Sequence, residues 1–388
     1  MRIGINMLVT SKAFSGFVSY IKDLLESLAK LDHQNKYFIL INPGNKEKIS
    51  TINLNDNFEY VIFNFPTFAY LRGLWEQFLL PLFLKEKRVD VLYCPGNTMP
   101  IFSSSKTVVL IGTIGPFCKD IYADKNLSIC QKVKYRLNRF MIVLSAKRAD
   151  IVIFESNYAR NLFVKSFKID RNKTKVIHHG KNEIFKPIIN SREIEKSKEK
   201  FAIKGKYILC VSHLHRYKNF LRLIQAFDKI KNKIPEDIKL VVAGKIVDKN
   251  YFNEIRTNIK NYNLEDRISF VGEVPHSDLL GLYSGCLFFV FPSLCENHSY
   301  ALVEALSCGT PIVCSNVTAM PETCKDAALY FNPYDVDDIS MKMLEMIRNR
   351  KLRQLLCKKA IERARTFPSY DQIAFKTLEI FEEVSKIR

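Results

Sequence analysis

The sequence lacks any apolar run long enough to cross a membrane. A transmembrane helix needs about 20 predominantly apolar residues, and no stretch of even about 18 occurs in this chain. The opening residues MRIGINMLVT are too short an apolar run for a signal peptide and are typical of a first strand. We therefore expect a cytoplasmic protein, with any membrane contact peripheral and on the inner face of the cytoplasmic membrane.

The ten cysteines form no C-x-x-C pair, so the usual spacing of a metal-binding cysteine site is absent. Several cysteines stand inside apolar runs, where a free cysteine behaves as a small hydrophobic residue. This usage suits a reducing cytosol, in which disulfides are rare. The sequence predicts no metal site and no disulfide framework.

Acidic residues are scarce, because 40 Asp and Glu stand against 59 Lys and Arg, which gives a formal net charge of +19. Such a charge calls for an anionic partner. The sequence shows no nucleic-acid-binding motif, so nucleic acid is not expected as that partner. Two interpretations stay open, namely contact with anionic lipid headgroups and a surface of scattered lysines without a partner. No internal repeat or low-complexity segment is present.

What the sequence does contain is typical of a globular protein of two domains. Hydrophobic residues make up 47% and aromatic residues 12% of its 388 residues. This length is large for one core and suits two domains of ordinary size. Residues 188–206 are polar and charge-rich, and we expect the interdomain linker and a first surface helix there. The predicted domains are therefore 1–187 and 188–367.

Two helical segments of the first half bear on partners. Residues 70–85 carry a broad apolar face, for which core burial is one interpretation and membrane contact the other. Residues 131–147 form a basic helix, and Arg148 follows directly. The cationic residues of this segment are Lys132, Lys134, Arg136, Arg139, Lys147 and Arg148.

The chain is organised around residues 287–315. The apolar run 287–291 predicts a buried strand, and a short loop then carries Glu296. Ser299 has the character of an N-cap for a helix over 300–307, which contains Glu304. Gly309 and Pro311 end that helix, and a further strand follows over 312–315.

Two carboxylates in this frame suit a sugar nucleotide. An open parallel sheet binds ligands beyond the carboxyl ends of its strands, which is where the loop of Glu296 lies. Helix N-termini offer N–H groups to a diphosphate, and carboxylates accept hydrogen bonds from sugar and ribose hydroxyls. The alternative for Glu304 is a solvated helix residue with no ligand.

The stretch is similar to the signature of the retaining glycosyltransferases of family 4, P-S-x-x-E-G-[FS]-G-L-x-x-x-E-A-[ML]-A-x-G-x-P. The matching residues are Pro292, Ser293, Glu296, Glu304, Ala305, Gly309 and Pro311. The resemblance extends over nearly the whole chain. It implies the α/β fold of the GT-B type, with two facing Rossmann-like domains, parallel sheets and an interdomain cleft. It also implies that a C-terminal helix, 368–388, packs back on the first domain.

The resemblance implies roles for particular residues. Glu304 would bind the ribose of the donor, and Glu296 hydroxyls of the transferred sugar. Lys218 matches a basic residue that pairs with the donor diphosphate. Arg216 is a candidate substitute for an arginine whose place is taken here by His213. The remaining donor-binding candidates are Gly16, Gly244, Gly272, Val274, His298, Ser299 and Tyr300.

One pair departs from the family pattern. The strand over 107–111 is followed by Gly112 and Thr113, where the family usually has His-Asp facing the reacting sugar. Those two roles therefore do not transfer to these positions. Farther along, His178 and His179 suggest a metal, but adjacent residues on a strand point in opposite directions, so a shared ion is not expected.

The function implied is an enzyme, a retaining glycosyltransferase (a hexosyltransferase). It would move a sugar from a nucleoside-diphosphate sugar to a glycan or lipid-linked acceptor in cell-surface polysaccharide or lipopolysaccharide synthesis. No cofactor is implied, and no metal is needed if cations and helix N-termini neutralise the leaving diphosphate. A sugar-nucleotide epimerase of the same architecture and a non-catalytic nucleotide-sugar-binding subunit remain the alternatives.

Overall fold

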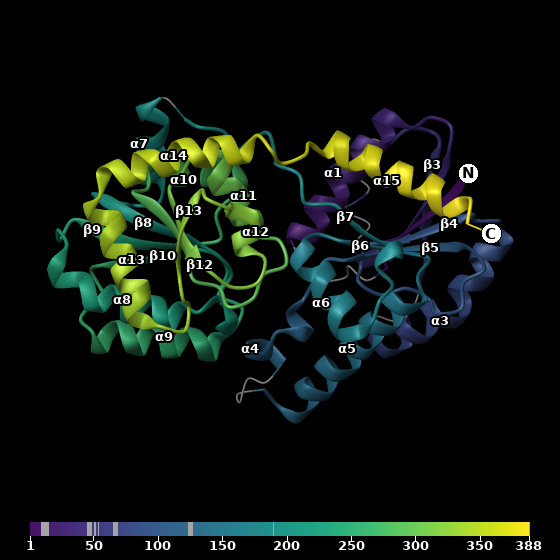
Figure 1. The fold of residues 1–388 in the computed structure, drawn as a ribbon, viewed down its shortest axis with the longest axis horizontal. Coiled ribbons are helices and arrows are strands. Elements are labelled where there is room, and N and C mark those ends of the chain that lie inside the picture. The colour runs from purple at the N-terminus through teal and green to yellow at the C-terminus, as the bar shows by residue number, and fades with distance from the viewer. Residues whose placement is uncertain are drawn as a thin grey trace. The chain divides into compact units, whose positions relative to one another are not determined.

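The protein is described from a computed structural model that covers residues 1–8, 15–44, 49, 52, 54–64, 69–122, 127–188 and 190–387. The chain divides into two compact units, which are described separately (Figure 1). The first unit comprises Met1–Phe117, Lys125–Gly180 and Pro368–Arg388. The second comprises Cys118–Asp124 and Lys181–Phe367.

The first unit is built on a seven-stranded sheet with the order β3-β2-β1-β4-β5-β6-β7. Its strands are β1 (Arg2–Asn6), β2 (Lys36–Ile41), β3 (Phe58–Ile62), β4 (Val91–Cys94), β5 (Lys106–Ile111), β6 (Ile151–Phe154) and β7 (Thr174–Val176). All its described pairings are parallel. Strands β4 and β6 are buried at every position, as expected for a sheet with both faces covered.

Helices cover this sheet. They are α1 (Ser15–Leu31), α3 (Ala69–Glu86), η1 (Gly115–Phe117), α5 (Ile129–Arg148), α6 (Asn157–Phe167), η2 (Arg171–Lys173) and α15 (Tyr370–Ser385). The last helix of the chain lies beside the first, so the ends of the sequence meet within one unit (Figure 1). Ile373, Phe381 and Val384 of α15 are buried there.

The second unit holds a six-stranded parallel sheet with the order β10-β9-β8-β11-β12-β13. Its strands are β8 (Lys206–Val211), β9 (Ile238–Ala243), β10 (Ile268–Gly272), β11 (Phe288–Phe291), β12 (Ile312–Ser315) and β13 (Ala328–Phe331). Strand order reverses at β8, which lies between β9 and β11. At such a reversal, open α/β sheets bind ligands in the crevice beyond the carboxyl ends of the strands, which here are β8 and β11.

The second sheet is covered on both faces. Its helices are α4 (Lys119–Tyr122), α7 (Ser191–Lys200), η3 (Arg216–Lys218), α8 (Phe220–Ile230), η4 (Lys231–Lys233), α9 (Lys249–Asn261), α10 (His276–Gly285), α11 (Tyr300–Ser307), α12 (Met320–Cys324), α13 (Val336–Arg348) and α14 (Arg350–Ala364). One hydrophobic cluster joins α8, α9 and α13 to one face, and a second joins α10 and α11 to the other. Figure 1 shows these two groups on opposite sides of the strands.

The predicted fold class is confirmed, since both units are parallel-sheet α/β structures. The expectation of reduced cysteines is wrong at one pair, because Cys118 and Cys295 are joined by a disulfide. Sequence spacing gave no warning of this bond, since the two residues are 177 positions apart. No helix among the described residues is long and apolar enough to span a membrane.

Candidate active site

Lys218 and Glu296 meet at the carboxyl ends of β8 and β11. Lys218 ends the short helix η3, which follows β8, and Glu296 stands in the loop after β11. The lysine Nζ lies 2.6 Å from Oε1 of Glu296. Their side chains are only 14% and 12% exposed. The two residues that the sequence assigned to different parts of one ligand therefore form a single ion pair beyond the carboxyl ends of these strands.

Backbone contacts hold the two loops together. The N–H of Leu294 donates to the carbonyl of Tyr217 over 2.8 Å, which ties the loop of Glu296 to η3. The N–H of Glu296 donates to Oγ1 of Thr318 over 3.1 Å. Thr318 itself has a positive φ of 55°, a conformation in which only a few per cent of non-glycine residues are found. The backbone that carries the Glu296 side chain is thus held by contacts among three loops.

The environment of Lys218 keeps it cationic. Burial by itself lowers the pKa of Lys218, but the Glu296 carboxylate outweighs burial, with Tyr217 acting in the same direction, and the pKa is held above its usual value. The ammonium also lies 5.1 Å and 5.3 Å from the ring centroids of Tyr217 and Phe291. Such ring faces attract cations. A permanent positive charge is what a diphosphate requires.

Glu304 is held by a residue that the sequence reasoning missed. The hydroxyl of Tyr283, on α10, donates to Oε2 of Glu304, on α11, over 3.0 Å. Burial raises the pKa of Glu304 to about 7, and the hydrogen bond from Tyr283 opposes this effect. No spacing rule relates these residues, because they come from different helices. Their contact depends on the packing of α10 and α11 against one face of the sheet.

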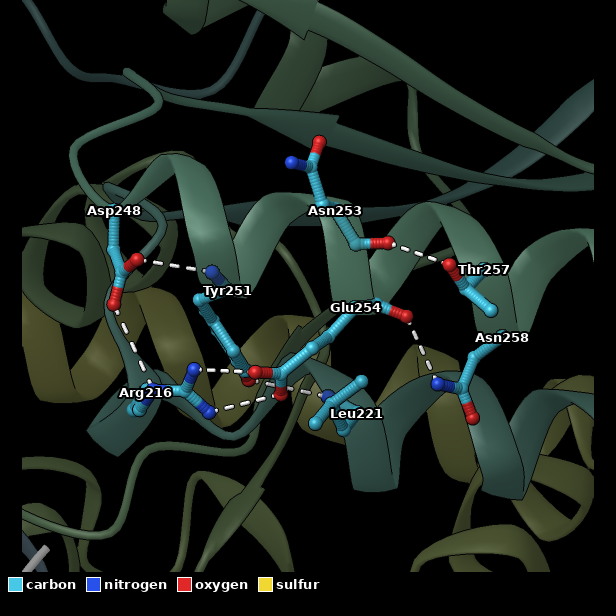
Figure 2. A network of polar contacts seen from close by, with 8 residues as sticks. All are labelled: Arg216, Leu221, Asp248, Tyr251, Asn253, Glu254, Thr257 and Asn258. Atoms are coloured by element: carbon cyan, nitrogen blue, oxygen red, sulfur yellow. Dashed lines mark hydrogen bonds and ion pairs between the residues drawn. The ribbon is translucent and has the colours of Figure 1, made fainter. Parts of the chain in front are cut away.

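Arg216 points elsewhere (Figure 2). Its guanidinium makes two hydrogen bonds to the carboxylate of Glu254 on α9, one of them 2.9 Å long. Its Nε lies 3.6 Å from the carboxylate of Asp248, and its cationic centre lies 5.0 Å from the ring centroid of Tyr251. The structure therefore places this candidate against α9, whereas Lys218 faces Glu296.

Two glycine candidates lie at the carboxyl ends of β9 and β10. Gly244 follows β9 with a φ of +152°, and a Cβ there would lie 2.0 Å from the carbonyl oxygen of Ser212. Gly272 ends β10 with a φ of +75°, and a Cβ there would meet nothing within 4 Å. The N–H of Gly244 donates to the carbonyl of Gly272 over 2.7 Å. Val274 is buried in the core cluster shared with α10 and α11.

The other candidates lie near helix N-termini. Ser299 is the N-cap residue of α11, as predicted, but its side chain makes no capping hydrogen bond. His298 before it is buried, with its ring 6.1 Å from that of Phe367, and Tyr300 is the first residue of α11. Gly16 lies in the first turn of α1, in the first unit.

Gly112 and Thr113 directly follow β5. Their N–H groups both donate to Oδ1 of Asn97, over 2.8 Å and 2.9 Å. Among the described residues no cluster of three or more His, Cys, Asp and Glu side chains could hold a metal ion. His178 and His179 instead both contact Glu155, one at its carbonyl and the other at its carboxylate.

Two family models match the chain, one in each half. Residues 14–182 match the model described as Glycosyltransferase Family 4, and residues 191–365 match Glycosyl transferases group 1. The chain belongs to glycosyltransferase family 4 and has the GT-B type of fold.

Similar proteins agree with this assignment. O-antigen chain mannosyltransferase B of Escherichia coli is 30% identical over 176 residues, which are 45% of each chain. O-antigen chain mannosyltransferase RfbU of Salmonella typhimurium is 26% identical over 70% of this chain and 68% of its own. The Anabaena protein Alr3699/HepE, solved with UDP and glucose, superposes with a TM-score of 0.76 over 99% of this chain and all of its own at 17% identity. The match thus spans less than half of the first of these relatives.

Proposed function

We propose that this protein is a retaining glycosyltransferase that uses a nucleoside-diphosphate sugar. It would transfer the sugar to a glycan or lipid-linked acceptor in cell-surface polysaccharide or lipopolysaccharide synthesis. The observation that carries the proposal is the pair of Lys218 and Glu296 at the point where strand order reverses, with Glu304 on the helix that follows. Relatives named as O-antigen mannosyltransferases support the same class of reaction.

Each residue of the crevice has a distinct part in this proposal. Lys218 pairs with the diphosphate and neutralises the charge that grows on it as the sugar leaves. Glu296 accepts hydrogen bonds from hydroxyls of the transferred sugar, and Glu304 accepts them from the ribose. When a donor enters, Lys218 exchanges part of its contact with Glu296 for phosphate oxygens. This exchange leaves the carboxylate available to the sugar.

Arg216 is the second cation of the proposal. To reach a diphosphate its guanidinium must leave Glu254 and Asp248, which hold it on α9 (Figure 2). The free energy lost with these ion pairs therefore offsets part of the binding free energy that Arg216 gains from the diphosphate. We expect Arg216 to contribute less than Lys218.

The proposed reaction takes place on one face of the sugar. The bond from the anomeric carbon to the diphosphate oxygen breaks, and the acceptor oxygen bonds to the same face of that carbon. The proton of the acceptor hydroxyl passes to the leaving phosphate. No metal is required in this scheme, because Lys218 and helix N-termini supply the positive potential.

A panel of nucleoside-diphosphate hexoses, with mannose donors first, tests the proposal. Each is incubated with a membrane extract that contains lipid-linked glycans, and the products are identified by mass spectrometry, with and without EDTA. We expect one donor to give a glycosylated product, whose linkage keeps the donor's anomeric configuration, in both conditions. A donor changed into its epimer without an acceptor would indicate the epimerase instead. Binding of the nucleotide sugar with no conversion would indicate the non-catalytic subunit.

Membrane contact is the second part of the proposal, and α5 carries it. Ile129, Val133, Leu137 and Phe140 are exposed large apolar side chains, with exposed fractions from 51% to 81%. They recur every three or four residues, so they lie along one side of the helix. Lys132, Lys134 and Arg136 alternate with them and are exposed as well. An apolar stripe flanked by cations matches an anionic lipid surface.

Vesicle sedimentation distinguishes the contribution of the cations from that of the apolar stripe. We expect binding to vesicles that contain phosphatidylglycerol, with little binding to neutral vesicles, and a decrease as salt rises. The variant Lys132→Glu with Arg136→Glu should lose the preference for anionic vesicles. The variant Val133→Ser with Leu137→Ser should weaken binding even at low salt. Equal binding of the parent protein to both kinds of vesicle would contradict a charge-directed membrane surface.

A further inference from the structure

The carboxyl ends of β5, β6 and β7 bring an acid and an imidazole together in the first unit. Ile111 of β5 is paired with Phe154 of β6, which is paired with Val176 of β7. Gly112 directly follows β5, and Glu155 directly follows β6. The segment with His178 and His179 comes shortly after β7. Oε1 of Glu155 lies 3.0 Å from Nε2 of His179.

This pair is buried and well supported. The Glu155 and His179 side chains are 8% and 5% exposed. Nδ1 of His178 lies 2.9 Å from the carbonyl oxygen of Glu155, which fixes the backbone of the acid against the end of β7. The Tyr20 and His179 rings make a T-shaped contact, with their centroids 5.2 Å apart. Burial raises the pKa of Tyr20, and the charge of Glu155 acts in the same direction, so its hydroxyl stays protonated.

Gly112 supplies the space that the carboxylate occupies. A Cβ built on Gly112 would lie 2.9 Å from Oε1 of Glu155 and 3.5 Å from its Cδ. Gly112 does not have a positive φ, so its backbone conformation does not itself require glycine. The absence of a side chain there serves the carboxylate, because any larger residue would compete with Oε1 for the same volume.

Stability alone gives a weak reason for such a pair. Replacing a buried ion pair by packed apolar residues is often neutral or stabilising. The carboxyl edge of an open parallel sheet is, by contrast, where ligands bind. A carboxylate accepts hydrogen bonds from hydroxyls, and an imidazole that donates to one of its oxygens fixes its orientation.

We propose that Glu155 binds a hydroxyl of the sugar acceptor and that His179 positions its carboxylate in the space left by Gly112. This inference rests on the proposed glycosyl transfer and adds a residue on the acceptor side. The donor crevice of Lys218 and Glu296 lies in the other unit. Changes at Glu155 should therefore affect the acceptor and leave the nucleotide unaffected.

Steady-state kinetics with the acceptor found in the donor panel provide the test. Glu155→Gln keeps the shape and removes the charge, and we expect it to raise the acceptor KM about ten- to a hundredfold. The donor KM and the nucleoside-diphosphate Kd should stay within a factor of two. Gly112→Ala should act in the same direction, because its methyl group displaces the carboxylate. Glu383→Gln is the matched control, because it removes an exposed ion pair to Lys175 of β7.

A rescue series tests the positioning role of His179. His179→Gln retains an N–H donor and should keep most of the acceptor affinity, whereas His179→Phe should match Glu155→Gln. Thermal unfolding checks that each variant is folded. An acceptor KM unchanged in folded Glu155→Gln, or a parallel loss of donor affinity, would overturn the inference.

If no donor sugar is transferred, the proposed function is refuted. A direct binding measurement then still tests the inference about Glu155. Methyl α-D-mannoside is titrated into the parent protein and Glu155→Gln while the ring protons of His179 are followed by NMR. A saturable shift in the parent that is lost in the variant supports hydroxyl binding at Glu155. No shift in the parent overturns it.

Discussion

The hydroxyl of Tyr283 donates a hydrogen bond to Glu304 over 3.0 Å and so links two helices on one face of the second sheet. Burial raises the pKa of Glu304 to about 7 from an ordinary value of 4.5. Near neutral pH this carboxyl group is thus divided between its neutral and charged forms. Only the charged form is a strong acceptor for ribose hydroxyls.

Nucleotide affinity should therefore depend on pH through Glu304. As pH rises through about 7 the carboxylate forms, so the parent protein should gain affinity relative to Glu304→Gln, roughly tenfold between pH 6 and pH 8. Calorimetry with the cognate nucleoside diphosphate measures both proteins, and their ratio cancels the titration of the diphosphate itself. Tyr283→Phe removes a bond that lowers the pKa, so its midpoint should move above that of the parent.

The same titration predicts an effect on stability. The pKa of Glu304 is raised in the folded state, so the folded protein holds this proton more tightly than the unfolded chain does. The resulting contribution to the free energy of unfolding is fully present below about pH 4.5 and is lost as pH rises through about 7. Glu304→Gln should therefore gain stability relative to the parent between pH 5 and pH 8 in urea unfolding. A difference in unfolding free energy that does not change with pH would contradict the raised pKa.

Removal of Lys218 should weaken diphosphate binding more than removal of Arg216. Lys218→Ala should cost about 1.5–3 kcal/mol, roughly ten- to a hundredfold in Kd, with little change for the nucleoside alone. Arg216→Ala should cost less, since its guanidinium is already paired with Glu254 and Asp248. Because Lys218→Ala also leaves Glu296 unpaired, the double variant Lys218→Ala with Glu296→Gln serves as the control. Equal diphosphate affinities for the parent and Lys218→Ala would refute the assignment.

The two glutamates should differ in their kinetic effects. Ribose does not change during the reaction, so the contact of Glu304 is mostly uniform binding, and Glu304→Gln should mainly raise the donor KM. The transferred sugar becomes positively charged near the transition state, so Glu296→Gln should mainly lower kcat. Steady-state kinetics with the cognate donor decide this. If both variants stay within a factor of two of the parent in kcat and KM, this crevice is not the active site.

Gly244 should tolerate no side chain. A Cβ at this position would lie 2.0 Å from the carbonyl oxygen of Ser212, and its φ is +152°, so Gly244→Ala should destabilise the protein by roughly 2–4 kcal/mol. Gly272→Ala is the matched control, because its φ is also positive but its Cβ would meet nothing within 4 Å. That variant should cost only about 1–2 kcal/mol. Thermal unfolding of both variants provides the measurement, and equal losses would contradict the steric explanation.

The sequence predicted the parts of this site that depend on local patterns. The helix over 300–307 and the strand over 312–315 have the predicted bounds, because capping residues and apolar runs determine them within a few positions. Lys218 and Glu296 could each be singled out from a motif. Their direct ion pair could not, since it depends on how the loops after β8 and β11 come together.

What the sequence did not reveal involves partners from distant elements. The contacts of Tyr283 with Glu304 and of Arg216 with α9 depend on helix packing, and no periodicity encodes that. The departure at Gly112 could be seen in the sequence, but its meaning required the position of Glu155, which directly follows the neighbouring strand β6. Gly112, which departs from the family pattern, is the local signal in the sequence that would have indicated the site of Glu155.

The position of α15 has a consequence for how the chain folds during synthesis. The first unit includes residues Pro368–Arg388, which are synthesised after Lys181–Phe367 of the second unit. Domains generally fold from the N-terminus as they leave the ribosome. We therefore expect the first unit to stay incomplete, with β4 and α1 only partly covered, until α15 emerges. The second unit should therefore complete its folding before the first, although synthesis of the first unit begins earlier.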